Sequence, residues 1–440
     1  MALFPAAAGY AGHFSVLTRR ADEALAKAGF EHLLIASGIE KMRFLDDMPY
    51  PFKANPQFKA WLPLLQHPGS WIAYTPGRTP VLAYFQPDDY WHVPPSPPAG
   101  DWVEHFDVRV ITDPAEAAKH LPATGKRAII GEADAALPGF EPNNPPVLLA
   151  YLNFQRALKT PYELALMRRA QRKAVPGHMA ARQAFLDGGS EAQINAAYLA
   201  AAGHTDSDVP YNNIVALNEN GATLHYQYKS FERPRDSRSL LIDAGAEVDG
   251  YASDITRTWV RDDELFGELV ETLDREQQAL AGKVRAGLDY RQLHLEAHLR
   301  LGEVLKSLGI VDMEPDSMLQ NGVTSTFFPH GLGHPIGLQV HDVAGFSDVD
   351  GKLIPRPAGH PYLRMTRTLA PGMVVTIEPG IYFIPTLLEK LRADAKFGKT
   401  VDWGRVEHLA KFGGVRIEDE VHCTEGAPEN LTRDAFAELA

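Results

Sequence analysis

The fold is decided by residues 240–256, which read LLIDAGAEVDGYASDIT. Apolar and β-branched residues flank the dipeptide Asp249-Gly250, and such a dipeptide is the strongest short signal for a hairpin with a two-residue type I′ turn. A turn at this point sets the register of the two strands. It makes Asp243 and Asp254 diagonal neighbours on one face, about 7–8 Å apart at the backbone. The sequence therefore predicts a hairpin that holds two carboxylates together.

Two carboxylates that face each other in a core repel, and burying them without a partner costs several kcal/mol. Such a pair needs a cation between its members. The alternative for Asp243 and Asp254 is an exposed sheet face, where both side chains point to solvent and no cation is required. Three later segments favour the cation.

The first segment is residues 328–341, FPHGLGHPIGLQVH, in which three histidines stand among prolines and glycines that forbid a helix. In the second, Glu378 ends an apolar strand. In the third, the period of two along a strand aims Arg416, Glu418 and Glu420 at one face. Because a carboxylate at the end of a buried strand is costly unless it is paired, these segments indicate a common site.

Charge balance supports a site with two divalent metal ions. Two such ions would neutralise the four carboxylates of Asp243, Asp254, Glu378 and Glu418. One neutral histidine would be the fifth ligand. Oxygen-rich ligation with a single imidazole favours Mn²⁺ among the first-row metals, and Co²⁺ or Zn²⁺ could take its place.

Composition excludes several other classes of protein. The chain has 440 residues, 45% hydrophobic and 22% charged, which is typical of a globular protein rather than a disordered or fibrous one. Its formal net charge of −13 gives no basic surface for nucleic acid or an anionic membrane. The single cysteine, Cys423, excludes an intrachain disulfide and any multi-cysteine metal site. No run of about 18 apolar residues occurs, and residues 1–12 lack the basic start of a signal peptide, so we expect a cytoplasmic protein.

Two domains are expected, residues 1–158 and 159–440. The first alternates helical and strand-like segments, which predicts an α/β domain. Its expected elements are a helix at 14–30, strands at 33–36, 71–74, 81–85 and 108–111, and a short helix opened by Asp113-Pro114.

The second domain is expected to be α+β, with helices that cover a mostly antiparallel sheet. Capping signatures at Thr160, Ser190 and Asp289 open three helices. Pro176 should break or kink the first of these helices, because proline removes a backbone donor and clashes with the preceding turn. Strand-like segments occupy residues 239–244, 251–260, 373–377 and 414–423.

The ordered ligand set resembles that of the dinuclear metallopeptidases with the pita-bread fold. Its members stand in the contexts IDAG, SDIT, HGLGH, IEPG and VRIED: Asp243, Asp254, His334, Glu378 and Glu418. Over almost the whole chain, the sequence is also similar to bacterial Xaa-Pro dipeptidases and organophosphorus acid anhydrolases, chiefly at residues 44–48, 50–53, 55–61 and 214–220. This resemblance implies an α/β N-terminal domain, used for dimerisation and the pocket rim, and a pita-bread catalytic domain.

The resemblance also implies roles in a hydrolytic reaction. All five ligands would bind metal, and a water held between two cations loses a proton near neutral pH, which supplies a hydroxide for attack on the scissile carbonyl. Glu378 would exchange a proton with this nucleophile. His225 and His341 would stabilise the oxyanion and the leaving proline nitrogen. Arg416 would hold the ligand carboxylates in place.

Four more residues are implied to bind substrate. Arg364 matches the position that holds the C-terminal carboxylate of a dipeptide, which suits a planar guanidinium; the alternative is a surface arginine. Tyr211 and His330 would line the pocket or serve only in packing. Asp47 would reach the α-amino group of a substrate bound in the other subunit of a homodimer, unless it belongs to a solvated turn.

The predicted function is hydrolysis of Xaa-Pro dipeptides by a metal-dependent dipeptidase. The first alternative is an aminopeptidase P that acts on longer peptides with proline in second position. Organophosphate triester hydrolysis could accompany either activity, because a metal hydroxide attacks phosphorus by the same charge logic. A non-catalytic peptide-binding module would be expected to lack metal ligands, and all five are present.

Overall fold

The computed structural model describes residues 9–439 and divides the chain into two compact units. The first runs to Leu166 and includes residues 249–251 and 347–353, and the second contains the remainder. Residues 1–8, part of the stretch whose composition argued against a signal peptide, lie outside the described residues. The predicted domain boundary near residue 158 stays a prediction.

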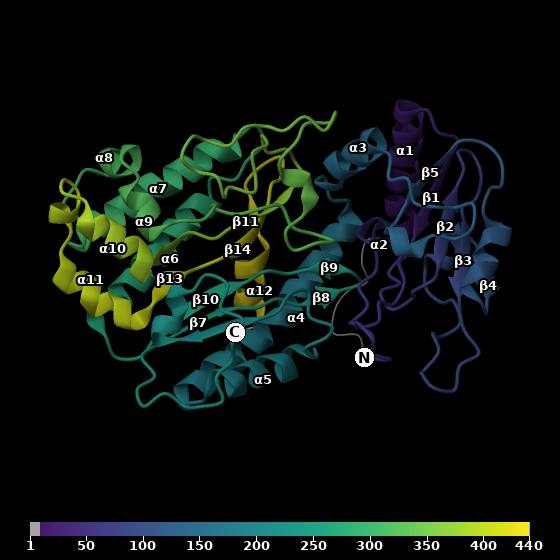
Figure 1. The fold of residues 1–440 in the computed structure, drawn as a ribbon. Coiled ribbons are helices and arrows are strands. Elements are labelled where there is room, and N and C mark those ends of the chain that lie inside the picture. The colour runs from purple at the N-terminus through teal and green to yellow at the C-terminus, as the bar shows by residue number, and fades with distance from the viewer. Residues whose placement is uncertain (1–8, 440) are drawn as a thin grey trace. The chain divides into compact units, whose positions relative to one another are not determined.

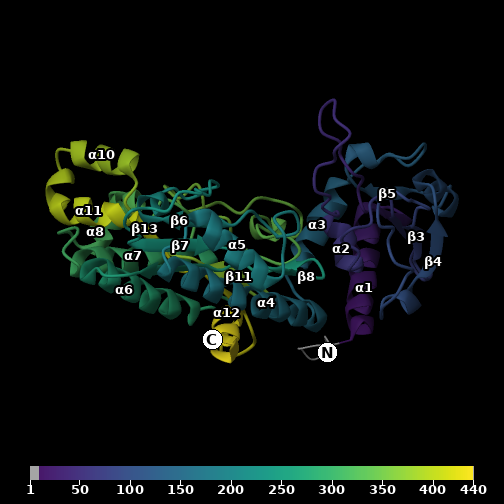
Figure 2. The same cartoon turned by 90° about the horizontal axis from the view of Figure 1, so that it is seen from below.

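The first unit contains a five-stranded mixed sheet (Figures 1 and 2). Its strands follow the order β4-β3-β2-β1-β5 and have these bounds: β1 His32–Ala36, β2 Trp71–Tyr74, β3 Val81–Phe85, β4 Asp107–Ile111 and β5 Arg127–Ile130. Parallel pairs join β1 to β5 and β3 to β4, and the other neighbours are antiparallel. Its α-helices are α1 Tyr10–Ala28, α2 Pro56–Trp61 and α3 Pro146–Arg156. The segment that follows Asp113 is a 3₁₀ helix, Pro114–His120.

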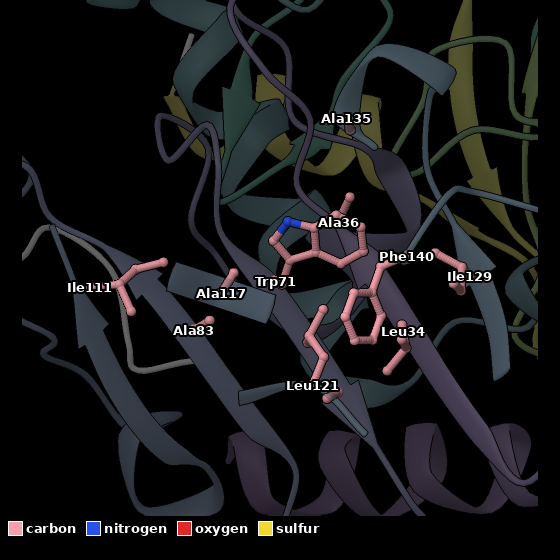
Figure 3. Close-up of a cluster of buried hydrophobic side chains, with 11 residues drawn as sticks. Leu34, Ala36, Trp71, Ala83, Ile111, Ala117, Leu121, Ile129, Ala135 and Phe140 are labelled. Carbon is pink, nitrogen blue, oxygen red and sulfur yellow. The ribbon is translucent and has the colours of Figure 1, made fainter. Parts of the chain in front are cut away.

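A buried apolar cluster lies on one face of this sheet (Figure 3). It takes one residue or two from every strand, and side chains from the connecting segments complete it. Its members include Leu34, Ala36, Trp71, Ala73, Ala83, Ile111, Ile129, Leu121 and Phe140. Alternate residues of a strand share a face, which is why Leu34 and Ala36 belong to the cluster together. The predicted α/β character of this domain is confirmed.

The second unit is α+β, as predicted. Its helices are α4 Pro161–Leu186, which begins in the first unit, α5 Glu191–Ala202, α6 Glu264–Ala281, α7 Tyr290–Ser307, α8 Pro315–Gln320, α9 Val323–Phe327, α10 Pro385–Ala393, α11 Trp403–Leu409 and α12 Leu431–Leu439. Its strands are β6 Ile214–Leu217, β7 Ser239–Asp243, β8 Glu247–Val248, β9 Tyr251–Ala252, β10 Thr256–Val260, β11 Val374–Ile377, β12 Gly380–Tyr382, β13 Gly414–Arg416, β14 Asp419–His422 and β15 Glu429–Asn430. They form small sheets ordered β10-β7-β6, β11-β14-β15 and β12-β13, with antiparallel neighbours.

The predicted hairpin turn and register are both confirmed. Asp249 and Gly250 have φ of 50° and 92°, as a type I′ turn requires. The register of β7 and β10 pairs Asp243 with Thr256. Leu240 and Ile242 join α4 and α5 in one apolar cluster, so the alternation of the strand turns Asp243 to the opposite face of the sheet.

Two strands expected to be continuous are interrupted, and both interruptions carry a carboxylate. Residues 253–255 separate β9 from β10, and residues 417–418 separate β13 from β14. At the second break the chain changes partner, because β13 pairs with β12 whereas β14 pairs with β11. Glu418 forms an isolated bridge with Thr256 there, and its N–H donates to the Thr256 carbonyl at 3.1 Å.

The predicted break at Pro176 is wrong, because α4 continues through it to Leu186, whereas the kink given as its alternative stays a prediction. Val175 before the proline and His178 after it are fully buried. His178 Nε2 also donates to the carbonyl of Ala244 at 2.9 Å. Packing on both sides of the proline therefore outweighs the loss of one helical hydrogen bond. The capping signatures are present where predicted: Thr160 and Ser190 each bond reciprocally with the residue three positions later, and Asp289 caps α7.

Candidate metal centre

Five side chains predicted to bind metal line one cavity of about 660 Å³ in the second unit. They come from five places in the chain, each a strand end or a loop: Asp243 at the end of β7, Asp254 after β9, His334 in the loop before β11, Glu378 after β11 and Glu418 between β13 and β14. Asp243 and Glu418 are 175 positions apart in the sequence. They meet because Thr256 of the hairpin forms a β-bridge with Glu418.

The imidazole of His334 lies among three of these carboxylates. Its Nε2 atom is 3.5 Å from Asp254 Oδ2, 3.6 Å from Glu378 Oε1 and 4.0 Å from Glu418 Oε1. Its Nδ1 atom is 3.1 Å from the carbonyl of Pro335, which can only accept, so Nδ1 carries a proton. In the neutral ring the Nε2 lone pair therefore points at the carboxylates, which is the tautomer that a metal ion requires.

Three of the carboxylates have one oxygen held by the protein. Asp243 Oδ2 accepts from Arg416 Nη2 at 2.7 Å. Asp254 Oδ1 accepts from the Tyr211 hydroxyl at 2.6 Å, and Glu418 Oε2 accepts from the Thr256 hydroxyl at 2.7 Å. The second oxygens of Asp254 and Glu418 are the atoms that approach His334.

The second oxygen of Asp243, Oδ1, is buried and has no hydrogen-bond partner. A buried carboxylate oxygen without a partner is costly, and a coordinated cation would remove this cost. One oxygen oriented by a protein donor and one left for the ion is the usual arrangement of metal-binding carboxylates.

The electrostatics of the cluster also indicate a cation. Burial and the charge of Asp254 raise the pKa of Asp243 to about 6. Burial raises the pKa of Glu378 to about 7, and burial together with neighbouring carboxylates raises the pKa of Glu418. Burial acts in the same direction on Asp254, but the proximity of His334 outweighs it and lowers the pKa of Asp254. The donor set therefore fits divalent metal, since cations would offset the burial and the repulsion that raise three of the four pKa values.

The rim of the cavity contains several of the residues predicted to act on substrate. His225, His341 and Arg364 line it, and the ring of His341 stands edge-on to His334 at 4.5 Å between centroids. Desolvation and the charge of His334 lower the pKa of His341 to about 3, and desolvation also lowers the pKa of His225. Both histidines are therefore neutral at pH 7 in this environment, and each has one N–H to donate.

The other predicted residues have different positions. Tyr211 is absent from the cavity lining, although its hydroxyl holds Asp254. His330 lines the cavity, but Nδ1 donates to the Gly331 carbonyl and Nε2 accepts from the Tyr382 hydroxyl, at 2.8 Å each. Asp47 lies in the first unit, exposed, in a bend that follows the turn at Phe44 and Leu45.

Arg416 connects this network to the metal ligands. Nη2 donates to Asp243, Nη1 donates to the Tyr382 hydroxyl at 3.0 Å, and Nε donates to the Thr256 hydroxyl at 3.2 Å. Sequence reasoning missed Tyr382 and Thr256. The hairpin register could have identified Thr256, since it stands opposite Asp243. No comparable signal identifies Tyr382.

We expect Arg416→Lys to lower metal affinity or activity by about 10–100-fold, a typical effect for residues that hold metal ligands. Lysine keeps the positive charge but replaces the planar fork that reaches three partners. Metal titration and steady-state kinetics would measure the change. Arg405→Lys on α11 is the control, and an Arg416→Lys enzyme with parental metal affinity and activity would contradict the assignment.

Comparison with known proteins relates this geometry to a family. A model of the Xaa-Pro dipeptidase N-terminal domain matches residues 8–154, and a model of metallopeptidase family M24 matches residues 165–425. The Xaa-Pro dipeptidase of Xanthomonas axonopodis pv. citri (strain 306) is 54% identical over 431 residues, covering 97% of this chain and 98% of the relative. That of Stenotrophomonas maltophilia (strain R551-3) is 53% identical over 431 residues, covering 97% of each chain.

Solved structures give the same fold. Escherichia coli aminopeptidase P with the inhibitor Pro-Leu has a TM-score of 0.72 at 26% identity, covering 95% of this chain and 94% of the other. The zinc-substituted form of that enzyme in complex with product has a TM-score of 0.71 at 25% identity, with the same coverage. Within residues 9–439, no helix has both the length and the hydropathy needed to cross a membrane.

Proposed function

This chain belongs to metallopeptidase family M24, and from that premise we propose that the site hydrolyses the peptide bond of Xaa-Pro dipeptides with two Mn²⁺ ions bound. The observation that carries the proposal is the convergence of three carboxylates on Nε2 of His334, inside a peptide-sized cavity that a fourth, Asp243, also lines. The choice of Mn²⁺ rests on the oxygen-rich donor set, and Co²⁺ or Zn²⁺ would also fit. A cytoplasmic location is part of the proposal.

Five residues would hold the two ions: Asp243, Asp254, His334, Glu378 and Glu418. When bound, divalent ions supply a hydroxide nucleophile at neutral pH and polarise the scissile carbonyl. Glu378 is the proton carrier in this scheme, because its carboxylate lies at the cavity wall and burial raises its pKa to about 7, close to the working pH.

The neutral rings of His225 and His341 each offer an N–H donor from the cavity wall. One would stabilise the developing oxyanion, and the other would stabilise the proline nitrogen as it leaves, while the proton that this nitrogen gains would come from Glu378. Neutral rings suit this task, since a positive charge there would repel the ions. Tyr211 and Arg416 keep the carboxylates oriented, and His330 is committed to Tyr382 and the backbone.

Substrate length separates this function from its first alternative. The purified protein would be stripped of metal, reloaded with Mn²⁺ and given Ala-Pro, Ala-Pro-Ala and Ala-Ala. A dipeptidase cleaves Ala-Pro and loses activity when residues follow the proline. Faster cleavage of Ala-Pro-Ala would favour aminopeptidase P, and no cleavage of either proline peptide would contradict both. Turnover of a neutral phosphotriester, measured in parallel, would test the accompanying organophosphate hydrolysis.

Arg364 would determine preference for the short substrate. Its guanidinium lines the same cavity and lies near enough to affect the pKa of His225 and His341. We expect Arg364→Ala to raise KM for Ala-Pro by about tenfold or more, since a charge-assisted hydrogen bond of about 1.5–3 kcal/mol is lost. KM for a neutral phosphotriester should change little.

Arg356→Ala is the matched control, because Arg356 also lines the cavity but donates to the Leu363 carbonyl. Equal losses on the dipeptide and the phosphotriester would remove Arg364 from the carboxylate subsite.

We also propose a homodimer in which Asp47 of one subunit binds the α-amino group of a dipeptide held by the other. Supporting this are the exposure of Asp47 and the exposed apolar side chains beside it in the sequence, Phe44 and Leu45, 90% and 91% exposed. A carboxylate that meets an ammonium group in a partly dehydrated pocket interacts more strongly than it would in water.

The test co-refolds two impaired chains, Asp47→Ala and Glu378→Ala. If Asp47 acts across the dimer, each heterodimer contains one complete site, and part of the activity missing from both homodimers should return. A verified heterodimer without dipeptidase activity, or a parent enzyme that is monomeric in the assay, would exclude the arrangement.

A further inference from the structure

A second group of metal-binding side chains lies outside the carboxylate site. His294 and His298 are four residues apart on α7, so both point to the same side of the helix. His360 approaches them from the loop before β11. One ring nitrogen from each of the three lies within 4.8 Å of one from each of the others. Two histidines one turn apart on a helix are a common metal-chelating pair, and a third completes a facial set.

The three rings surround a common point. The ring centroids of His294 and His298 are 4.8 Å apart at 87°, and those of His294 and His360 are 4.7 Å apart at 87°. His298 and His360 are 4.6 Å apart at 68°. A cavity of about 230 Å³, lined by His294 and His360, leaves room for an ion and a water.

The hydrogen bonds of His298 leave one nitrogen available. Its Nδ1 bonds to the Thr324 hydroxyl at 2.9 Å, whereas its buried Nε2 has no partner, and the residue is only 1% exposed. When Nδ1 donates to Thr324, the Nε2 lone pair is unused. A buried polar atom without a partner is rare in native structures, and a bound ion or water at this nitrogen would account for it. Burial also keeps the three rings neutral, because it lowers the pKa of His294 to about 2 and of His298 to about 3.

The hydrogen bonds of His294 show what metal binding would change. Its Nδ1 accepts from the Leu332 N–H at 3.2 Å, so the neutral ring carries its proton on Nε2 and donates to His360 Nδ1 at 2.9 Å. To bind an ion through Nε2, His294 must move this proton to Nδ1. No net proton is released, but the Leu332 N–H loses its acceptor and His360 Nδ1 loses its donor, so the bonds to the ion must outweigh both losses.

We propose that His294, His298 and His360 form a mononuclear site for a divalent ion of intermediate softness such as Zn²⁺, distinct from the carboxylate site. Three imidazoles without a carboxylate suit Zn²⁺ better than Mn²⁺, whereas the carboxylate site has the opposite preference. Three protein ligands also leave a fourth tetrahedral position for water, as the cavity permits.

Zn²⁺ content per chain tests the proposal. Parent enzyme and the variants His298→Ala, His360→Ala and His408→Ala would be dialysed against the same free Zn²⁺ concentrations and analysed for metal and protein. The parent should hold one more Zn²⁺ per chain than His298→Ala or His360→Ala, whatever number the carboxylate site retains. His408→Ala is the matched control, because His408 pairs with Asp263, the N-cap of α6, belongs to neither cluster and should leave the Zn²⁺ content unchanged.

Two further measurements make the test specific. Thr324→Val retains all three nitrogens but removes the partner of His298 Nδ1, so Zn²⁺ affinity at this site should fall by about 10–100-fold. In crystals soaked with Zn²⁺, anomalous scattering should give a peak within coordination distance of the three rings. Because His360 lies in a loop and is only partly buried, His360→Ala should fold even if His298→Ala does not. Equal Zn²⁺ content in parent and a folded His360→Ala protein, or the absence of the anomalous peak, would overturn the proposal.

Discussion

Glu418→Gln is expected to abolish peptidase activity, a loss well beyond the about 100-fold that typically follows removal of a residue that only orients ligands. Glutamine has nearly the same shape and can still accept from the Thr256 hydroxyl, which is 2.7 Å from Glu418 Oε2. It removes one of the four negative charges that would neutralise two divalent ions. The loss of charge, rather than a loss of packing, is therefore what the substitution tests.

Stability measurements distinguish this effect from unfolding. In the metal-free protein, Glu418 is almost fully buried beside other carboxylates, and burial together with repulsion raises its pKa. The Gln variant should therefore be at least as stable as the parent without metal. Added Mn²⁺ should raise the Tm of the parent more than that of the variant. Glu407→Gln, on the surface of α11, is the control. A Glu418→Gln protein that binds Mn²⁺ like the parent and turns over normally would show that the site is wrongly assigned.

Removal of metal is the second large effect. A chelator should eliminate activity, and Mn²⁺ should restore it. Ions that bind only the folded state stabilise it by about 2.7 kcal/mol at a concentration one hundred times the dissociation constant, so the Tm should rise with Mn²⁺ concentration. Thermal unfolding over a range of Mn²⁺ concentrations measures this. Full activity in the metal-free enzyme would contradict the proposed function.

Protons should compete with the metal in a defined pH range. The pKa values of Asp243 and Glu378 are raised to about 6 and about 7 without metal, so Mn²⁺ must displace protons below pH 7 and its affinity should fall as the pH is lowered through this range. The stability of the metal-free protein should change in the opposite sense. The unfolded chain releases these protons near pH 4, so the folded state binds more of them between about pH 4 and 7, and its stability falls as the pH rises. Calorimetric titration and unfolding at several pH values would measure both trends.

Local chemistry accounts for the features that were predicted correctly. A type I′ turn needs positive φ at two consecutive residues, and Asp249-Gly250 tolerates this, so the register that pairs Asp243 with Thr256 could be derived from seventeen letters of sequence. The reciprocal caps at Thr160 and Ser190 depend on residues three positions apart, and the structure contains both. The ligand types and their oxygen-rich character follow from composition around these elements.

Features that depend on neighbours distant in the sequence were not predictable in this way. Pro176 carries a strong local signal against a helix, yet the burial of Val175 and His178 by other elements outweighs it. The sequence did not show that the chain changes its partner strand between β13 and β14, because an interrupted strand and a continuous one have the same period of two. Tyr382 was missed because its hydroxyl matters only through Arg416 and His330.

The sequence by itself determined the hairpin, the starts of the three helices with capping signatures, the class of each domain and the residue types able to bind metal, because short-range backbone geometry and charge balance depend on residues near one another in the chain. Only the tertiary structure decided which oxygens remain available for ions and which ring nitrogen of His334 faces them. It also brought His360 to the pair on α7. These outcomes depend on hydrogen bonds between residues far apart in the sequence, and such bonds are formed only once the chain has packed.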